Sequence, residues 1–217
     1  MKYDGVIFDN DGVLIEIHRS GDVYEKALKK LFKQQGVKPA KKDLKPFLYN
    51  RNVRKVEKIC KKYGLNTREF WKRKEELTYG IQKKMILDGY KTLYSDTDVL
   101  RDINLPMGIV SNNQQAIVDF IAKNYAEHSF ECSYGREKSL EGLSRRKPDT
   151  YYLKKCMSDM NVKNPLFIGD SSVDIEVAHK MGIDSVFIRR EHREGYYVTK
   201  RPTYEIKSLE ELPGILN

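Results

Sequence analysis

The chain has 217 residues, of which 40% are hydrophobic, and its 40 Lys and Arg against 31 Asp and Glu give a formal net charge of +9 at pH 7. A chain of this length can bury a full hydrophobic core and can hold one domain with a sizeable insertion. No stretch reaches the roughly 20 consecutive apolar residues that a membrane helix needs, which excludes a helical membrane-spanning protein.

The first expected element is a short strand over residues 3–8, which is rich in β-branched and aromatic side chains. It ends at Asp9, and Asp11 and Gly12 follow at once. Acidic groups at the end of a buried strand are costly unless positive charge meets them, and carboxylate oxygens suit Mg²⁺. The alternative interpretation is an Asx-type turn, which Asp, Asn and Gly favour for purely local reasons.

A run of helices is expected next. Apolar side chains recur at helical spacing, and Gly or a capping residue marks the ends of the segments. The three expected helices cover residues 21–35, 51–63 and 67–87. We therefore expect an all-helical region between the first strand and residue 88.

Much of the positive charge lies on these helices, in pairs such as Lys29-Lys30 and Lys61-Lys62. Lysines that recur along amphipathic helices usually form a solvated face. A positive field that attracts an anionic substrate is the functional alternative. Basic patches also attract nucleic acid, but no recognised binding motif accompanies them, so we do not expect nucleic acid as a partner.

Strands and helices alternate over the rest of the chain. Strands are expected over residues 107–113, 130–134, 165–169, 185–188 and 204–206. Helices are expected over residues 95–104, 113–125, 149–160, 173–181 and 208–212. This alternation predicts the α/β class with a doubly wound parallel sheet. Within the unassigned polar segment 189–201, we expect Arg190, His192 and Arg193 to be exposed loop charge rather than ligand contacts.

Polar side chains follow two more of these strands and precede one helix. The groups are Ser111-Asn112-Asn113, Lys147-Pro148, and Gly169-Asp170 with Asp174. The carboxyl ends of parallel strands meet at one edge of a sheet, where open α/β folds bind ligands. We therefore expect these groups to gather around Asp9.

In this order the four groups resemble the motifs of the haloacid dehalogenase-like hydrolase superfamily, in the branch with a helical cap inserted after the first strand. Asp9 to Leu14 are similar to the first motif, Ser111 to the second, Lys147 to the third, and Gly169-Asp170 with Asp174 to the fourth. The resemblance covers essentially the whole chain and is most similar to the phosphoglycolate phosphatase-like group. It implies a Rossmann-like core of residues 1–15 and 89–217 and a cap of residues 16–88.

The resemblance implies a Mg²⁺-dependent phosphoric monoester hydrolase. Asp9 would be the nucleophile that forms an aspartyl-phosphate, and Asp11 would be the general acid and base. For the acid step Asp11 must be protonated, so we expect desolvation and the charge of Asp9 to raise its pKa. Asp9, the backbone carbonyl of Asp11 and the carboxylate of Asp170 would hold the Mg²⁺.

The remaining motif residues are implied to bind the phosphoryl group or to orient the others. Ser111, assisted by Asn112, would bind a phosphoryl oxygen, and Lys147 would neutralise charge on Asp9 and on the transferred group. Asp174 would orient water or Lys147. For Ser111 and Asp174 the alternative is a local role at the start of the following helix.

The expected function is hydrolysis of a small phosphomonoester, either phosphoglycolate-like or a sugar phosphate. A sugar phosphomutase of the β-phosphoglucomutase type shares all four motifs and is the main alternative. A non-catalytic nucleic-acid-binding protein would have no need of both Asp9 and Asp11. Carbon–halogen hydrolases of the same superfamily lack the second acid, so Asp11 argues against a dehalogenase.

The remaining expectations concern the cellular setting. Cys60, Cys132 and Cys156 are widely spaced, without paired metal-ligand spacing, and we expect free thiols in a reducing cytoplasm. The first strand begins almost at once, so no secretory signal is expected. A cytoplasmic protein with a small phosphorylated metabolite as its partner is the resulting prediction, with the oligomeric state left open.

Overall fold

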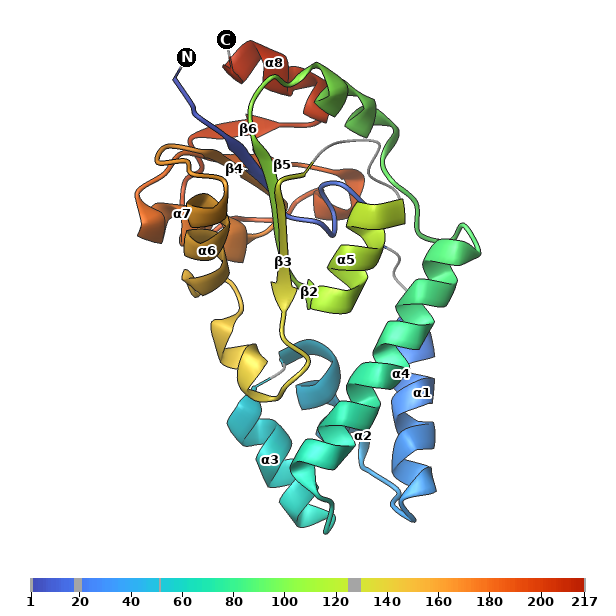
Figure 1. The fold of residues 1–217 in the computed structure, drawn as a ribbon. Helices are drawn as coiled ribbons and strands as arrows, with labels where there is room; N and C mark the ends of the chain where they lie inside the picture. Colours follow the sequence, from blue (N-terminus) through green and yellow to red (C-terminus); the bar gives the residue numbers. More distant parts are fainter. Residues whose placement is uncertain (1, 18–20, 51, 125–129, 217) are drawn as a thin grey trace. The chain divides into compact units, whose positions relative to one another are not determined.

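The computed structural model describes residues 2–17, 21–50, 52–124 and 130–216. The chain divides into two compact units (Figure 1). The larger unit contains residues 1–17, 91–136 and 145–217, and the smaller unit contains residues 18–90 and 137–144.

The larger unit is built on a six-stranded parallel sheet. Its strands are β1 (Val6–Phe8), β2 (Met107–Gln114), β3 (Cys132–Arg136), β4 (Leu166–Gly169), β5 (Ser185–Ile188) and β6 (Tyr204–Ile206). Their order is β3-β2-β1-β4-β5-β6, and every neighbouring pair is parallel. The predicted doubly wound α/β class is confirmed. The strand order reverses between β1 and β4, which is where folds of this class bind ligands.

Helices cover both faces of this sheet: α5 (Gln115–Asn124), α6 (Tyr151–Asp159), α7 (Ser172–Met181) and α8 (Leu212–Leu216) (Figure 1). Side chains alternate along each strand, so Val6 and Phe8 of β1 join one buried cluster and Ile7 joins the other. The first cluster includes side chains of α5 and α8, and the second includes side chains of α6 and α7. Both faces of the central strands are therefore buried, as expected for a parallel sheet.

Most predicted elements differ from the observed ones only at their ends. Two predicted helices of this unit are exceptions: residues 95–104 form a 3₁₀ helix at Ser95–Asp102, and residues 208–212 form a 3₁₀ turn at Leu209–Glu211, after which α8 begins at Leu212. Further 3₁₀ turns occupy Glu141–Arg145 and Glu191–Arg193. The predicted helix start at residue 51 and helix end at residue 125 lie outside the described residues.

The smaller unit is helical, with α1 (Gly21–Gln34), α2 (Lys41–Lys45), α3 (Val53–Lys62) and α4 (Thr67–Leu87). A π-helical turn follows α2 at Pro46–Asn50. Three aromatic rings form the centre of its core, because Phe70 lies 4.5 Å from Phe32 and 5.5 Å from Phe47 between ring centroids. The sequence analysis missed α2 because Leu44 is the only apolar residue of its five, too few to show a helical period.

A short segment that is distant in sequence completes the smaller unit. Leu140 and Leu143 belong to the same buried cluster as Phe32 and Phe70. The indole Nε1 of Trp71 donates a hydrogen bond to the backbone oxygen of Lys138, at 3.1 Å. Residues 137–144 therefore pack within the helical unit, although the core range expected from the sequence, 89–217, includes them.

Arg190 and Asp96 form a buried ion pair within the larger unit. The guanidinium Nη1 and Nη2 lie 2.5 and 2.9 Å from the two carboxylate oxygens, and both residues are 9% exposed. Asp96 also accepts hydrogen bonds from the Ser208 hydroxyl and the Leu209 amide. The expectation that Arg190 is exposed loop charge is wrong, because Asp96, 94 positions earlier, provides a counter-charge that no local pattern reveals.

Replacing Asp96 with Asn should destabilise the protein in a pH-dependent manner. Burial acts to raise the pKa of Asp96, but the bonds from Arg190, Leu209 and Ser208 outweigh it and lower that pKa. The stabilisation is therefore present above the unfolded pKa of about 4 and disappears as the pH falls through the lower folded pKa. At pH 7 we expect a loss of about 3 kcal/mol, because Arg190 is left buried without its partner.

The measurement is urea unfolding of the wild type and Asp96→Asn at neutral pH and near pH 3. The gap between the two midpoints should be smaller at the acidic pH. Glu210→Gln, on the exposed side of the Leu209–Glu211 turn, is the control and should change little at either pH. An equal gap between wild type and Asp96→Asn at both pH values would contradict the prediction.

Two of the three cysteines are brought together. Cys132 on β3 and Cys156 on α6 form a disulfide, with their Cα atoms 6.1 Å apart. Gly108 on β2 provides the space, since a Cβ there would lie 2.5 Å from the Sγ of Cys156 and 2.9 Å from that of Cys132. The expectation of free thiols is thus wrong for this pair, because sheet pairing joins positions 24 residues apart, while Cys60 is free and buried.

Among the described residues, no helix is long and apolar enough to cross a membrane.

Candidate active site

The end of β1 places Asp9 beside the loop that carries Lys147. The ammonium Nζ of Lys147 lies 2.8 Å from Oδ1 of Asp9 and 2.7 Å from Oδ1 of Asp174, and it donates to the backbone oxygen of Val110. The Lys147 side chain is 2% exposed. Burial acts to lower the pKa of Lys147, but the carboxylates of Asp174 and Asp9 outweigh it and raise that pKa, so the ammonium is charged.

Asp174 has two partners because of its position in the first turn of α7. It completes a capping box in which its carboxylate accepts from the Ser171 backbone amide at 3.0 Å. Its other oxygen faces Lys147. Asp174 thus both caps α7 and contacts Lys147, and its role in orienting Lys147 or water stays a prediction.

Three buried carboxylates face one another here. Ligand atoms of Asp9, Asp170 and Asp174 all lie within 4.8 Å of one another. Burial raises the pKa of Asp9 to about 8; Lys147 acts against this rise, and Asp174 and Asp170 add to it. The Lys147 ammonium therefore does not offset the burial of Asp9 together with its two acidic neighbours, and a divalent cation bound among them would favour the ionised form of Asp9.

The donor set fits Mg²⁺, which takes hard oxygen ligands from carboxylates and backbone carbonyls. Gly12, with φ of +84°, allows the loop after β1 to lie against Asp170, because a Cβ at this position would come within 2.3 Å of Oδ2 of Asp170. The loop after β1 therefore packs directly against the carboxylate of Asp170.

Replacing Gly12 with Ala should cost more than replacing another glycine of similar backbone conformation. Gly36 has φ of +72° and no atom within 4 Å of the position a Cβ would take, so Gly36→Ala measures the backbone strain alone. That strain is about 1–2 kcal/mol. Gly12→Ala adds the clash with Asp170 and should lower the urea midpoint further, and equal midpoints for the two variants would contradict this account.

Asp11 lies in the same loop but faces other partners. Its carboxylate pairs with the ammonium of Lys91 through Oδ1 and accepts from the side-chain amide of Asn113 at 2.8 Å through Oδ2. Burial acts to raise the pKa of Asp11, yet Lys91 and the amides of Asn113 and Asn10 lower it below its usual value. The expectation of a raised pKa is wrong here, because Lys91 is 80 positions away in sequence and could not be anticipated as a partner.

Ser111 and Asn112 lie in the carboxyl-terminal half of β2. The Ser111 hydroxyl oxygen accepts from the Asn113 amide at 3.1 Å. The Asn112 side chain holds the Lys147 loop, because Nδ2 donates to the Lys147 oxygen at 3.2 Å and Oδ1 accepts from the Lys147 amide at 2.7 Å. Asn112 therefore positions Lys147, a contact that its motif position did not indicate.

Asp170, after β4, receives two side chains from the turn that follows β5. His192 Nε2 lies 2.7 Å and Arg193 Nε lies 2.9 Å from Oδ2 of Asp170. The sequence analysis expected exposed charge for both residues, and this is wrong because the turn at Glu191–Arg193 places them over the end of β4. No signal in the sequence links them to Asp170.

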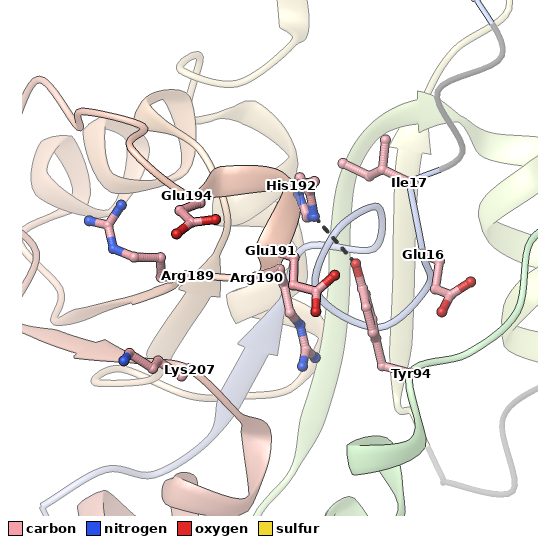
Figure 2. Close-up of a pocket in the computed structure, with 9 residues that line it drawn as sticks. All are labelled: Glu16, Ile17, Tyr94, Arg189, Arg190, Glu191, His192, Glu194 and Lys207. Carbon is pink, nitrogen blue, oxygen red and sulfur yellow. Dashed lines mark hydrogen bonds between the residues drawn. The ribbon is translucent and has the colours of Figure 1, made fainter.

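His192 also lines a pocket of about 760 Å³ in the larger unit. Figure 2 shows the His192 ring directed at the Tyr94 hydroxyl, with Nδ1 and Oη 3.4 Å apart. The other residues that line this pocket are Glu16, Ile17, Arg189, Arg190, Glu191, Glu194 and Lys207. None of the motif residues lines it, so the pocket adjoins the carboxylate cluster through His192 rather than containing it.

Comparisons with known proteins agree with this architecture. The sequence model described as haloacid dehalogenase-like hydrolase matches residues 6–188. No curated protein is significantly similar to the chain.

Solved structures are similar over nearly their whole length. A haloacid dehalogenase-type phosphatase of Thermococcus onnurineus is 21% identical with a TM-score of 0.65, and the match covers 99% of this chain and 98% of that chain. A protein of Haemophilus somnus, provisionally described as a phosphoglycolate phosphatase, is 18% identical with a TM-score of 0.64 and coverage of 100% and 99%. A provisional β-phosphoglucomutase of Thermotoga maritima is 15% identical with a TM-score of 0.59 and coverage of 98% of each chain. At sequence identities this low, the structural similarity shows a shared fold and nothing further.

Proposed function

This chain belongs to the haloacid dehalogenase-like hydrolase family, and we propose that it is a Mg²⁺-dependent phosphatase that hydrolyses a small phosphomonoester. The observation that carries the proposal is the buried contact of Asp9 with Lys147 beside the carboxylates of Asp170 and Asp174. A nucleophilic carboxylate at the end of a central strand, flanked by one fixed cation and by further oxygen ligands, is suited to a phosphoryl group that carries several negative charges.

In the proposed first step, a carboxylate oxygen of Asp9 forms a bond to phosphorus and the bond from phosphorus to the ester oxygen breaks. The electron pair leaves with the ester oxygen, which takes a proton from Asp11 to become an alcohol. Lys147 offsets the charge on Asp9 and on the phosphoryl oxygens. Ser111 would donate a hydrogen bond to one of these oxygens.

In the proposed second step, water attacks the aspartyl-phosphate and Asp11 accepts the proton, which releases inorganic phosphate and regenerates Asp9. Ionised Asp11 is in the protonation state that this base role needs, while its ion pair with Lys91 lowers its pKa and weakens it as a base. For the acid role in the first step, Asp11 must be protonated, which requires that its ion pair with the Lys91 ammonium be broken.

Asp9, Asp170 and the backbone carbonyl of Asp11 would hold the Mg²⁺, and Asp174 lies within reach of the same cluster. Bound there, Mg²⁺ would reduce the repulsion between Asp9 and the phosphoryl oxygens. The surrounding residues shield this site from solvent, because Asp9 is 7% exposed and Asp170 only 1%.

The substrate proposed is a small phosphorylated metabolite, and phosphoglycolate is the first to test. A sugar phosphomutase is the second candidate, supported by the structural neighbour provisionally described as a β-phosphoglucomutase. Both reactions need the same phosphorylated Asp9. They differ in whether water or a second sugar hydroxyl receives the phosphoryl group.

The test is release of inorganic phosphate from a panel of phosphomonoesters, with Mg²⁺ and with EDTA, alongside isomerisation of sugar phosphates. We expect Mg²⁺-dependent release from at least one small ester. Turnover confined to interconversion of sugar phosphate isomers would favour the mutase. Salt-sensitive binding of DNA or RNA without any turnover would overturn the proposed activity in favour of a binding protein.

A further inference from the structure

We propose that His192 and Arg193 are positioning residues that hold the carboxylate of Asp170 in the orientation required to bind a divalent cation. This inference rests on the proposed function, because it concerns the same metal site. It assigns a role to the segment after β5, which the family motifs do not include.

Both contacts converge on one oxygen of Asp170. His192 Nε2 and Arg193 Nε lie 2.7 and 2.9 Å from Oδ2, and Gly12 borders the same oxygen. Neither contact involves Oδ1, the second oxygen. Two donors on one oxygen determine the plane of the carboxylate, so Oδ1 is the oxygen presented to a cation among Asp9, Asp170 and Asp174.

The turn that carries the two donors is itself anchored on both sides. Arg190 precedes it, pairs with Asp96 through two nitrogens and also donates from Nη2 to the Val13 oxygen at 2.8 Å. Arg189 donates from Nη1 to the backbone oxygens of Arg193 and Tyr196, at 3.2 and 2.9 Å. An exposed loop that carried only solvated charge would not need these contacts.

A second set of contacts ties the turn to the start of α7, close to Asp170. The Arg193 guanidinium lies 4.6 Å from the centre of the Tyr196 ring. The Tyr196 hydroxyl lies 3.3 Å from the Ser172 amide, which donates to it, and 3.2 Å from the Ser172 hydroxyl. Arg193 is therefore held between Tyr196 and Asp170, which restricts the rotamers of its long side chain before any ligand binds.

The histidine has an equivalent support. When Nε2 donates to Asp170, the neutral ring can accept at Nδ1 from the Tyr94 hydroxyl, 3.4 Å away (Figure 2). The Arg190 guanidinium packs 3.8 Å from the centre of the Tyr94 ring. Tyr94, Arg190 and His192 thus form a packed layer behind the Asp170 carboxylate.

The experiment measures cation binding directly, with Mn²⁺ followed by electron paramagnetic resonance at one fixed pH and without substrate. We expect His192→Leu and Arg193→Met each to weaken Mn²⁺ binding by about 10- to 100-fold, the usual effect of losing a partner that orients a metal ligand. His192→Gln should recover much of the affinity, because its amide can still donate to Oδ2. Glu191→Gln, in the same turn but directed into the pocket of Figure 2, is the matched control and should bind as the wild type does.

Urea midpoints of all variants, measured with EDTA, separate a positioning role from a structural role. A purely structural role would lower the midpoints of His192→Leu and Arg193→Met. In that case His192→Gln would also fail to restore Mn²⁺ binding. If His192→Leu and Arg193→Met bind Mn²⁺ more tightly than the wild type, the two residues repel the cation and the inference is overturned. If the wild type itself binds no divalent cation, the proposed metal dependence fails as well. Binding by the wild type with unaffected variants leaves the proposed function standing and removes only this inference.

Discussion

Asp9→Asn should abolish phosphate release, lowering kcat by about 10⁴-fold or more, which is the order of loss when a covalent nucleophile is removed. The amide is nearly the same size and can still accept a hydrogen bond from Lys147, so the fold should be retained. Its oxygen is neutral and a poor nucleophile toward phosphorus. The measurement is steady-state phosphate release with the best ester of the panel, with far-ultraviolet circular dichroism to verify folding.

Two further measurements make this prediction specific to Asp9. Asp98→Asn, on an exposed carboxylate whose side chain is 78% accessible, is the matched control and should leave kcat unchanged. In the wild type, rapid acid quenching followed by peptide mass spectrometry should find a phosphoryl group on the peptide that contains Asp9. Mg²⁺-dependent turnover that survives Asp9→Asn would rule out the aspartyl-phosphate mechanism.

Lys147→Met should be the most damaging single change to stability within the site. The Lys147 ammonium is the fixed positive partner of Asp9 and Asp174, and all three side chains are buried or nearly so. Removing the ammonium leaves the buried carboxylate of Asp174 without its counter-charge, and loss of one member of a buried ion pair costs about 3–5 kcal/mol. Phosphate release should fall at the same time, because the transferred group loses the cation beside it. Urea unfolding in EDTA at neutral pH measures the first effect, and turnover at saturating Mg²⁺ measures the second.

Two controls separate charge from shape in this prediction. Lys154→Met, on the exposed side of α6, makes the same substitution without a buried partner and should change the midpoint little. The double variant Lys147→Met with Asp174→Asn should recover part of the stability, because it removes one of the carboxylates left unpaired. A double variant that is less stable than Lys147→Met alone would contradict the electrostatic explanation and indicate that packing of the lysine stem dominates.

The central strands β1, β4 and β5 were predictable because each is short, largely apolar and bounded by turn residues. Residues 185–188 and 204–206 were predicted as strands and form β5 and β6 with the same bounds. In α4, Thr67–Leu87, predicted and observed ends also coincide, since Asn66 and Gly89 punctuate a long amphipathic run. Local periodicity and end signals are properties of neighbouring residues, which is why they can be inferred without a structure.

The gathering of the motif residues was predictable for a different reason. Asp9 and Asp170 each follow a parallel strand, and the carboxyl ends of parallel strands share one edge of the sheet. In the structure β1 and β4 are neighbours, and the Asp9 amide donates to the Ile168 oxygen at 2.8 Å. Strand-end position therefore predicted proximity, while the chemical role of each residue remains a proposal to be tested.

By itself, the sequence determined the α/β class, the alternation of elements and the set of polar groups at the ends of the strands, because these depend on periodicity and on local turn chemistry. Only the tertiary structure decided the partners of those groups. Lys91 on Asp11, Arg193 on Asp170 and Asp96 on Arg190 are joined across 80, 23 and 94 positions. The pKa of a group depends on the charges that lie near it in space rather than along the chain. The sequence alone therefore did not reveal that Lys91 lowers the pKa of Asp11.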